Sequence, residues 1–393
     1  MNNIQPIMWS NKSDKYEMNI STFTKEKTSE HHIMIAPQGI SNFYEQYQTL
    51  KEALLSFILE RGKEQCKLIF QRVFFSDITN QSEIISEVDM LKDNEIESTI
   101  AWVQQPPLNH TKCTLYAYLI ESEEEMKVDT SKAPHHLKIE KAGYTHIWSG
   151  KLTSDKNGSS YDQTENIFAE YHRFLESEGF QFAEMCHRTW LYVRDVDTNY
   201  QGVVEGRNDY FDTIGLVPSN HFVTSTGIEG RDLDVRKNVL MDAYAVKGLE
   251  KSQIKYIHAL SHLNPTHEYG VRFERGTAID FGDRRHIYIS GTASIDNKGQ
   301  IVHPNQIILQ ADRAMENITA LLKEVEATPK NIMQMIIYLR DVADYSIVER
   351  YYNEQYPNTP KVIVLAPVCR PGWLIEIECV AIKSIHNPMF KNF

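Results

Sequence analysis

The segment 366–381 contains the residue types best suited to acid chemistry in this chain. Cys369 and Arg370 precede a Pro-Gly turn, and after the turn two glutamates, Glu376 and Glu378, alternate with isoleucines. A period of two predicts a half-buried strand with both carboxylates on one face. Two interpretations follow. Either this face is solvated at the edge of a sheet, or a carboxyl lines a cleft beside the thiol and the guanidinium and acts there as an acid.

Length and charge limit the classes of protein that fit this sequence. A chain of 393 residues with 41% apolar and 24% charged residues is typical of a globular protein with two or three domains. Its net charge of -12 argues against general nucleic-acid binding, which needs clustered lysine and arginine. A small anionic partner stays compatible with this charge if a few arginines converge locally.

The cysteines, histidines and apolar runs predict a cytoplasmic protein. The five cysteines form no CxxC pair and are odd in number, and residues 1–16 do not resemble a secretion signal, so we expect reduced thiols. The fifteen histidines show no metal-binding spacing. No run of about 18 apolar residues predicts a membrane span. We therefore expect no membrane contact, no metal and no organic cofactor.

The elements that must position the acidic segment recur three times along the chain. The first set has strands predicted over 17–23, 32–37, 67–77, 98–104 and 112–121 and helices over 42–61 and 81–91. The second has strands over 145–152, 184–196, 221–226 and 236–246 and helices over 165–178 and 202–214. The third has strands over 253–262, 271–279, 285–295, 331–341, 361–366 and 373–382 and helices over 305–326 and 345–354.

A common register supports this repetition. Gln46 lies 31 residues before Asp77, and Gln310 lies 31 residues before Asp341. Aligning these pairs also superposes apolar positions of the two helices. The predicted fold is therefore α+β, with three units that each form a sheet with two helices on one face. The predicted units span 1–121, 135–247 and 253–393, and the polar stretches 122–134 and 248–252 connect them.

The third unit contains a specific set of blocks, at 289–296, Gly299, Gln310, 317–318, 321–322, 338–341 and 376–378. As a set they resemble the Rid/YjgF family, which also includes the RidA and L-PSP proteins. Members of that family are typically trimers with clefts between neighbouring subunits. Three such units in one chain therefore imply an intramolecular pseudo-trimer, and we expect a monomer in solution.

One departure from the Rid pattern bears on the chemistry. The imine deaminases of that family hold the substrate carboxylate with an arginine early in the penultimate strand. The corresponding segment 359–364 contains Lys361 and no arginine. This departure argues against ordinary imine hydrolysis, and the lack of a basic groove argues against an endoribonuclease.

A second set of blocks covers residues 185 to 383. It consists of 188–192, 206–208, 225–228, 269–270, 273–275, 290–294 and 369–371, together with Glu376. These blocks resemble successive blocks of the chorismatase family, whose members hydrolyse chorismate and have folds like a Rid trimer formed from one chain. The resemblance also explains why the second unit carries polar motifs that plain Rid units lack.

The resemblance implies a role for Glu376. Chorismate carries two carboxylates, a hydroxyl and an enolpyruvyl ether, and hydrolysis of that ether needs protonation of the terminal enol carbon. A carboxylic acid in a partly desolvated cleft keeps its proton near neutral pH, and its carboxylate then stabilises the oxocarbenium ion. The motif position indicates Glu376 as this general acid, with Glu378 as the second candidate.

Two substrate carboxylates call for guanidinium partners, and Arg207, Arg275 and Arg370 lie within the matched blocks. The alternative is that these arginines pair with protein carboxylates, as Arg370 could with Glu376. Tyr192 ends a predicted strand that faces the same cleft. It either donates a hydrogen bond to the substrate or is a half-buried core residue.

Cys369 and Gly291 bear on the product. A buried apolar cysteine is the ordinary interpretation of Cys369. Chorismatases that form 3-hydroxybenzoate, however, resemble this chain in having cysteine and glycine at these two positions. The resemblance therefore implies 3-hydroxybenzoate, formed when the ring hydroxyl captures the cation, over a dihydroxycyclohexadiene carboxylate.

The sequence thus predicts a chorismatase-like hydrolase that releases pyruvate from chorismate, with Glu376 as its acid. Two alternatives stay open. One is a Rid-type enamine or imine deaminase, and the other is a non-catalytic protein that binds a small metabolite.

Overall fold

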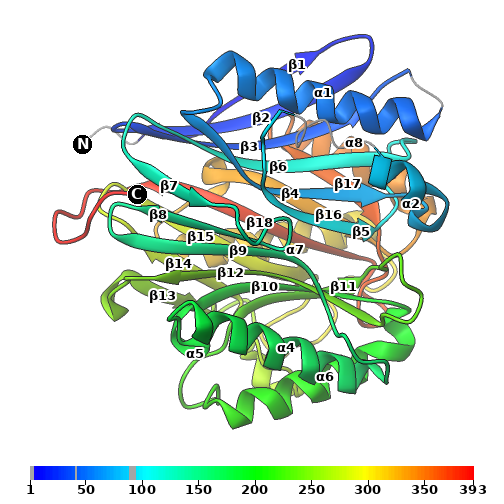
Figure 1. Cartoon of the computed structure of the whole chain (residues 1–393). Helices are drawn as coiled ribbons and strands as arrows, with labels where there is room; N and C mark the ends of the chain where they lie inside the picture. Colours follow the sequence, from blue (N-terminus) through cyan, green and yellow to red (C-terminus); the bar gives the residue numbers. More distant parts are fainter. Residues whose placement is uncertain (1–3, 40–41, 88–93) are drawn as a thin grey trace.

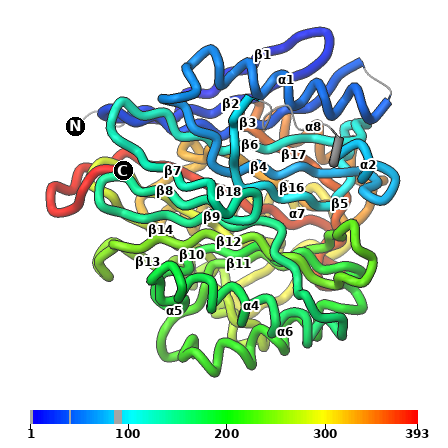
Figure 2. Tube along the Cα trace, viewed as in Figure 1, coloured from blue at the N-terminus to red at the C-terminus, as the bar shows by residue number. Residues whose placement is uncertain are grey.

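In the computed structural model, residues 4–39, 42–87 and 94–393 are described, and they form three six-stranded mixed sheets with helices packed on them (Figure 1). Each sheet is built from consecutive residues, and Figure 2 shows the chain passing from one unit to the next. The predicted α+β fold with three similar units is confirmed. Within the described ranges, no helix is long and apolar enough to cross a membrane.

The first sheet has the order β1-β2-β3-β6-β4-β5. Its strands are β1 (Ile7–Lys12), β2 (Tyr16–Lys25), β3 (Thr28–Pro37), β4 (Cys66–Phe75), β5 (Thr99–Gln104) and β6 (Cys113–Ser122), and its helices are α1 (Phe43–Arg61) and α2 (Ile78–Glu87). The helix predicted over 81–91 corresponds to α2, and positions 88–91 lie outside the described residues. β1 was not predicted, because this mostly exposed edge strand has no apolar face.

The second sheet has the order β7-β8-β9-β12-β10-β11. Its strands are β7 (Met126–Asp129), β8 (His136–Lys141), β9 (Tyr144–Thr153), β10 (Cys186–Val193), β11 (Thr224–Glu229) and β12 (Val239–Lys247), and its helices are α4 (Ser160–Ser177), α5 (Phe182–Met185) and α6 (Val196–Thr213). The connection predicted over 122–134 contains β7, which pairs antiparallel with β8 at the edge of this sheet.

The third sheet has the order β13-β14-β15-β18-β16-β17. Its strands are β13 (Ile254–Ile257), β14 (Gly276–Asp280), β15 (Arg284–Ala293), β16 (Ile332–Leu339), β17 (Lys361–Leu365) and β18 (Ile375–Ser384), and its helices are α7 (Ile307–Glu324) and α8 (Tyr345–Gln355). Short 3-10 turns lie at Lys251–Gln253, Thr266–Tyr269, Pro329–Asn331 and Val342–Asp344.

Helices cover the outer side of the assembly and the sheets meet inside it. In Figure 1, α1 lies above the first sheet, and α4 and α6 lie below the second. Separate apolar clusters fill the space between these helices and their sheets. A larger cluster joins all three sheets and includes Phe70 and Trp148, whose rings are 5.2 Å apart. This arrangement is the pseudo-trimer that the repeats predict.

Buried ion pairs link the units in a closed cycle. Arg72 of the first unit pairs with Asp242 of the second at 2.9 Å. Arg188 of the second unit pairs with Glu378 of the third at 2.7 Å. Arg284 of the third unit pairs with Glu30 of the first at 2.8 Å. Each junction therefore contains a buried charge pair, and loss of one partner would disturb the charge balance of a low-dielectric interior.

Candidate active site

A small cavity lies between the second and third units, and we call it the arginine pocket. Residues of α6 and β11 form one wall, and the segment 269–275, β15 and the start of β18 form the other. Its lining includes Tyr200, Arg207, Ser225, Tyr269, Phe273, Arg275, Gly291, Cys369, Arg370, Trp373 and Glu376. Six of the seven predicted site residues therefore meet in one place.

Glu376 begins the polar face of β18 and is buried. β18 lies between β15 and β16, so the interpretation of a solvated edge strand is wrong. Burial and the neighbouring charge of Glu378 raise the pKa of Glu376 to about 8, although Arg275 and Arg188 act in the opposite direction. Among the described residues, none donates a hydrogen bond to its carboxyl. Glu376 can therefore hold a proton at neutral pH and direct it at a ligand.

Gly291 allows this carboxyl to lie where it does. A side-chain carbon at position 291 would overlap the carboxyl group of Glu376 and would lie 3.0 Å from Cγ2 of Thr226. The backbone N–H of Gly291 donates to Oγ1 of Thr226 at 2.9 Å, which fixes the strand at this point. A residue without a side chain is thus required beside the acid.

Glu378 has a different environment, although it lies on the same strand. Its carboxylate accepts hydrogen bonds from Arg188 at 2.7 Å, Thr226 at 2.6 Å and Nε1 of Trp190 at 2.8 Å. These bonds hold the Glu378 carboxylate in the junction of the second and third units. Glu378 does not line the arginine pocket. Of the two carboxyls, Glu376 is therefore the one available to a ligand.

The three predicted arginines are free of protein carboxylates. In the part of the chain that the structure describes, no acidic side chain forms an ion pair with Arg207, Arg275 or Arg370, and the alternative pair between Arg370 and Glu376 is not formed. Arg207 and Arg275 are buried, and Nε and Nη2 of Arg207 and Nε of Arg275 have no hydrogen-bond partner. Buried guanidinium groups without partners are costly, so these groups are suited to an anion that enters the pocket.

Aromatic rings and backbone oxygens hold these guanidinium groups in place. Arg275 donates to the backbone oxygen of Asn264 at 3.1 Å and lies 5.4 Å from the centre of the Phe273 ring. Arg370 donates to the backbone oxygen of Tyr269 at 3.3 Å and lies over its ring at 4.8 Å. Such stacking fixes the planar groups and leaves their edges available.

Cys369 lies beside the acid in the same pocket. Burial and the charge of Glu376 raise the pKa of its thiol to about 12, although a hydrogen bond with Tyr200 acts in the opposite direction. The sulfur therefore carries its proton near neutral pH. It can shape the pocket and make weak hydrogen bonds, but it is a poor nucleophile in this state.

The structure places Tyr192 elsewhere. Its hydroxyl donates to Oδ2 of Asp242 at 3.1 Å, and its ring is buried beside the guanidinium of Arg72. Tyr192 thus belongs to the ion-pair network between the first two units and does not line the pocket. The predicted strand was correct, but alternation does not tell which inner surface of a three-sheet assembly a side chain reaches.

Several lining residues were not predicted as part of the site. Tyr200 lies two helical turns before Arg207 on α6, a spacing that puts both on one helical face and could have identified it. Ser225, Tyr269 and Phe273 lie within the matched sequence blocks. Trp373 follows the Pro-Gly turn, and no sequence pattern marks it as a lining residue.

The other two junctions do not repeat the acid. The strand pairings align β18 with β12 of the second unit and β6 of the first, and they place Leu240 and Thr114 at the position of Glu376. Both replacements lack an ionisable group. Among the three equivalent positions, only that of the third unit therefore carries an acid.

The arginine pocket is narrow, with a volume of about 20 Å³. One water needs roughly 10–15 Å³, so an organic ligand requires movement of the wall. The segment 269–275 forms part of this wall and is tied to α6 across the junction. Asn208 donates to the backbone oxygen of Gly270 at 2.9 Å, and Arg272 pairs with Asp212 at 2.5 Å.

A larger groove of about 820 Å³ lies apart from the arginine pocket, between α7 and the segment 259–262. Charged side chains of both signs line it, including Asp312, Glu316 and Lys323. It has no convergent arginines and no buried acid. We therefore base the chemistry on the smaller arginine pocket.

Comparisons with known proteins found relatives of the third unit and a structure similar to the whole chain. Residues 276–383 match the family model described as Endoribonuclease L-PSP. The 3-aminoacrylate deaminase RutC of Acinetobacter baylyi is 30% identical over 97 residues, which cover 24% of this chain and 77% of that protein. A RutC family protein of Saccharolobus solfataricus is 31% identical over 100 residues, which cover 25% of this chain and 79% of the relative.

The whole assembly is similar to a solved chorismatase structure. The TM-score is 0.62, and the match covers 91% of this chain and 100% of the chorismatase. The sequence identity is 15%, so the similarity concerns the fold. The third unit is thus similar to single RutC proteins, and the complete chain has the architecture of a chorismatase.

Proposed function

Because the chain belongs to the RutC family through its third unit and has the fold of a chorismatase, we propose that it cleaves the enolpyruvyl ether of chorismate in the arginine pocket. One observation carries the proposal: a buried carboxylic acid with a pKa raised to about 8 faces guanidinium groups that no protein carboxylate neutralises. A dianionic substrate supplies the missing negative charge.

Glu376 acts as the general acid. Its proton moves to the terminal methylene carbon of the enol ether, where a C–H bond forms from the electron pair of the double bond. The positive charge then lies on the ether carbon and its oxygen, next to the newly formed carboxylate of Glu376. The low-dielectric pocket strengthens this attraction in the transition state.

Arg207, Arg275 and Arg370 bind the two substrate carboxylates. Their partly unoccupied donor atoms and the rings stacked on them support this role. Binding holds the methylene carbon beside Glu376 and excludes water from the acid. Without a substrate anion, three neighbouring cations repel one another.

The products follow from how the cation is captured. Capture by the ring hydroxyl leads to 3-hydroxybenzoate and pyruvate, which together contain all the atoms of chorismate. Capture by water leads to pyruvate and a dihydroxycyclohexadiene carboxylate and consumes one water. The small volume of the pocket, with Cys369 and Gly291 beside the acid, supports the first route. Cys369 acts there as a neutral thiol that limits the space for water.

The likeness to a 3-aminoacrylate deaminase supports a second candidate, the hydrolysis of an enamine or imine. Lys361 is the cationic residue in the segment where the deaminases have arginine. Its ammonium donates to the backbone oxygen of Tyr356 at 2.9 Å, and it does not line the pocket. A non-catalytic metabolite-binding protein is the third candidate, which binding without turnover would distinguish.

The test is to incubate the purified protein with chorismate and to measure pyruvate and the aromatic product. We expect pyruvate and 3-hydroxybenzoate in equal amounts from the wild type. Glu376→Gln should lower the rate at least about 100-fold, as expected for loss of a general acid. Glu354→Gln, an exposed glutamate of α8, is the matched control and should keep full activity.

Absence of pyruvate from the wild type would refute the proposed reaction. Full activity of Glu376→Gln would refute the assigned acid. Ammonia release from an aminoacrylate or iminopropionate in a parallel assay would establish the deaminase instead.

A further inference from the structure

We propose that His31, Cys66 and Glu121 form a binding site for a divalent transition ion, with Zn²⁺ as the best match. The site lies in the first unit, which contributes no residue to the arginine pocket. It is therefore independent of the proposed reaction.

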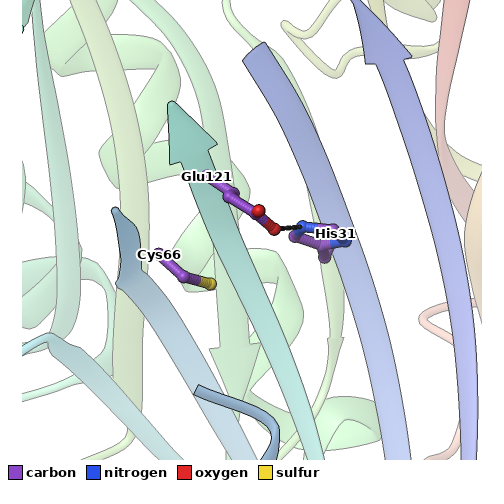
Figure 3. A group of neighbouring side chains, drawn as sticks. All are labelled: His31, Cys66 and Glu121. Carbon is purple, nitrogen blue, oxygen red and sulfur yellow. Dashed lines mark hydrogen bonds and ion pairs between the residues drawn. The ribbon is translucent and has the colours of Figure 1, made fainter. Parts of the chain in front are cut away.

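Three neighbouring strands bring the ligands together. β3 carries His31, β4 begins at Cys66, and Glu121 lies opposite Cys66 on β6, between the other two strands. Figure 3 shows the three side chains directed toward one common space. One ligand atom from each residue lies within 4.8 Å of the others, and Nε2 of His31 is 3.0 Å from Oε2 of Glu121. Small side-chain rotations would bring all three to one ion.

The thiol of Cys66 is a buried group without a partner. Its side chain is 1% exposed, and among the described residues none forms a hydrogen bond with the sulfur. The neighbouring carboxylate of Glu121 favours a cation beside the sulfur, and a bound cation would be held by the thiolate form of Cys66.

The surroundings supply an outer contact and a path for the ion. Nδ1 of His31 lies 2.9 Å from Oγ1 of Thr22, so the second ring nitrogen is held by a neighbour, as in most metal-bound histidines. The side chain of Glu121 is 35% exposed. The ion can reach the site from solvent, and water can complete a tetrahedral set of ligands.

The ligand chemistry selects the kind of ion. A thiolate, an imidazole and a carboxylate form a mixed S, N and O set, which is typical of Zn²⁺ and Co²⁺. Mg²⁺ and Ca²⁺ prefer oxygen ligands alone. We therefore expect no response to Mg²⁺.

Arg61 opposes binding and gives the proposal a sharp test. Its Nε lies 3.5 Å from Oε2 of Glu121, and its guanidinium stacks on Phe57 at 3.7 Å from the ring centre. A thiolate and a carboxylate neutralise a divalent ion, so the charge of Arg61 remains as an excess positive charge beside it. Arg61→Gln should therefore bind the ion several-fold more tightly.

The experiment titrates the metal-free full-length protein with Zn²⁺ against a chromophoric chelator and with Co²⁺ in an absorption cell. We expect one Zn²⁺ per chain, and a thiolate-to-cobalt charge-transfer band. Cys66→Ser should abolish the band, and Glu121→Gln should weaken binding of Zn²⁺ more than the roughly 10–100-fold typical of outer contacts. Chorismate turnover should be the same with and without the ion.

Two variants control for unrelated effects. Cys113→Ser removes another buried thiol of the same sheet, and Glu123→Gln removes a nearby exposed carboxylate. Both should keep the stoichiometry and the band. Failure of the wild type to bind Zn²⁺, unchanged binding in Cys66→Ser and Glu121→Gln, or weaker binding in Arg61→Gln would each overturn the site.

Discussion

Glu376 and Glu378 are two residues apart on β18, and their neighbours give them different properties. Glu378 accepts three hydrogen bonds, two of them from Arg188 and Thr226. Glu376 receives none from the described residues, and burial dominates its pKa. Hydrogen bonds from residues of the second unit therefore make Glu378 a structural anion, and the absence of such bonds from the described residues to Glu376 leaves it as the candidate acid.

The raised pKa of Glu376 predicts a pH dependence. The acid must be protonated in the free protein, so kcat/KM should be constant below pH 8 and fall as the pH rises through the pKa of about 8. Measuring kcat/KM for pyruvate release as a function of pH gives this falling limb of the profile. In Arg275→Gln the limb should move to higher pH, because a charge that lowers the pKa of Glu376 is removed. A shift to lower pH would contradict the assignment.

Gly291→Ala tests the position of the same carboxyl. The added methyl group would occupy the space of the Glu376 carboxyl, which must rotate away. We expect kcat to fall at least about tenfold, because a small misplacement of a catalytic group is costly. Thermal unfolding should show that the variant remains folded. An unchanged kcat would mean that the acid works from another rotamer.

For single residues, the sequence could indicate which side chains belong to the site, but it could not indicate which neighbours contact them. The block containing Arg370 and Glu376 could be recognised, because the spacing along one strand is local. The absence of a pair between them could not, since it depends on Tyr269 of a distant segment that holds the guanidinium. Tyr192 was misplaced for the same reason: its partner Asp242 lies on another strand.

Among the elements, the segment 269–275 forms part of the wall of the arginine pocket and is tied to α6. Its ion pair between Arg272 and Asp212 is partly exposed, so it contributes at most about 1 kcal/mol to stability. It can therefore break at small cost when a ligand binds. A pocket of about 20 Å³ requires such an opening.

Arg272→Gln should accelerate binding of substrate. With the tie to α6 weakened, we expect the association rate of chorismate, measured by stopped-flow fluorescence, to rise several-fold while the melting temperature changes little. Asp212→Asn should raise the rate by a smaller factor, because Arg272 keeps its hydrogen bond to the backbone oxygen of Asn208, and the double variant should match Arg272→Gln. Equal rates in all four proteins would show that this tie does not limit access.

Element boundaries differ from the predicted ones where the apolar pattern is weak. The strand predicted over 271–279 begins only at Gly276, because residues 271–275 turn away from the sheet to line the pocket. β1 and β7 are edge strands of six and four residues without a fully buried position, so they are too short and too exposed for their sequence pattern to indicate them. Interior strands such as β16 are buried along their whole length and were predicted well.

At the scale of the whole molecule, the cycle of buried ion pairs predicts sensitivity to acid. Burial alone would raise the pKa of Glu30, but the charges of His286 and Arg284 outweigh it and hold that pKa well below the usual value of 4.5. This carboxylate therefore stabilises the fold above pH 4.5, and the stabilisation is lost as the pH falls below it.

Glu30→Gln tests this linkage. At pH 7 the variant should be up to about 3 kcal/mol less stable to urea, because Arg284 and His286 lose this buried carboxylate and Arg284 keeps only Asp283 as an ionic partner. The difference should shrink progressively as the pH falls below 4.5, because the unfolded wild type then takes up a proton at Glu30 that the folded protein still excludes. A difference that is independent of pH would mean that packing, and not charge, explains the loss.

The pseudo-trimer also predicts the state of the protein in solution. Three units that close on one another satisfy the contacts that separate RutC-like subunits would make between chains. Light scattering should give a monomer near 45.5 kDa. A stable trimer of complete chains would contradict this closure.

The single acid at the junction of the second and third units has a consequence for symmetry. In an assembly of identical subunits, any substitution appears at every junction, so a buried acid would be present three times and would burden the fold three times. Here Leu240 and Thr114 fill the equivalent positions without a charge. Because the three units are linked in one chain, one junction can carry a reactive acid while the other two carry uncharged packing residues. A ring of identical subunits cannot differ between its junctions in this way.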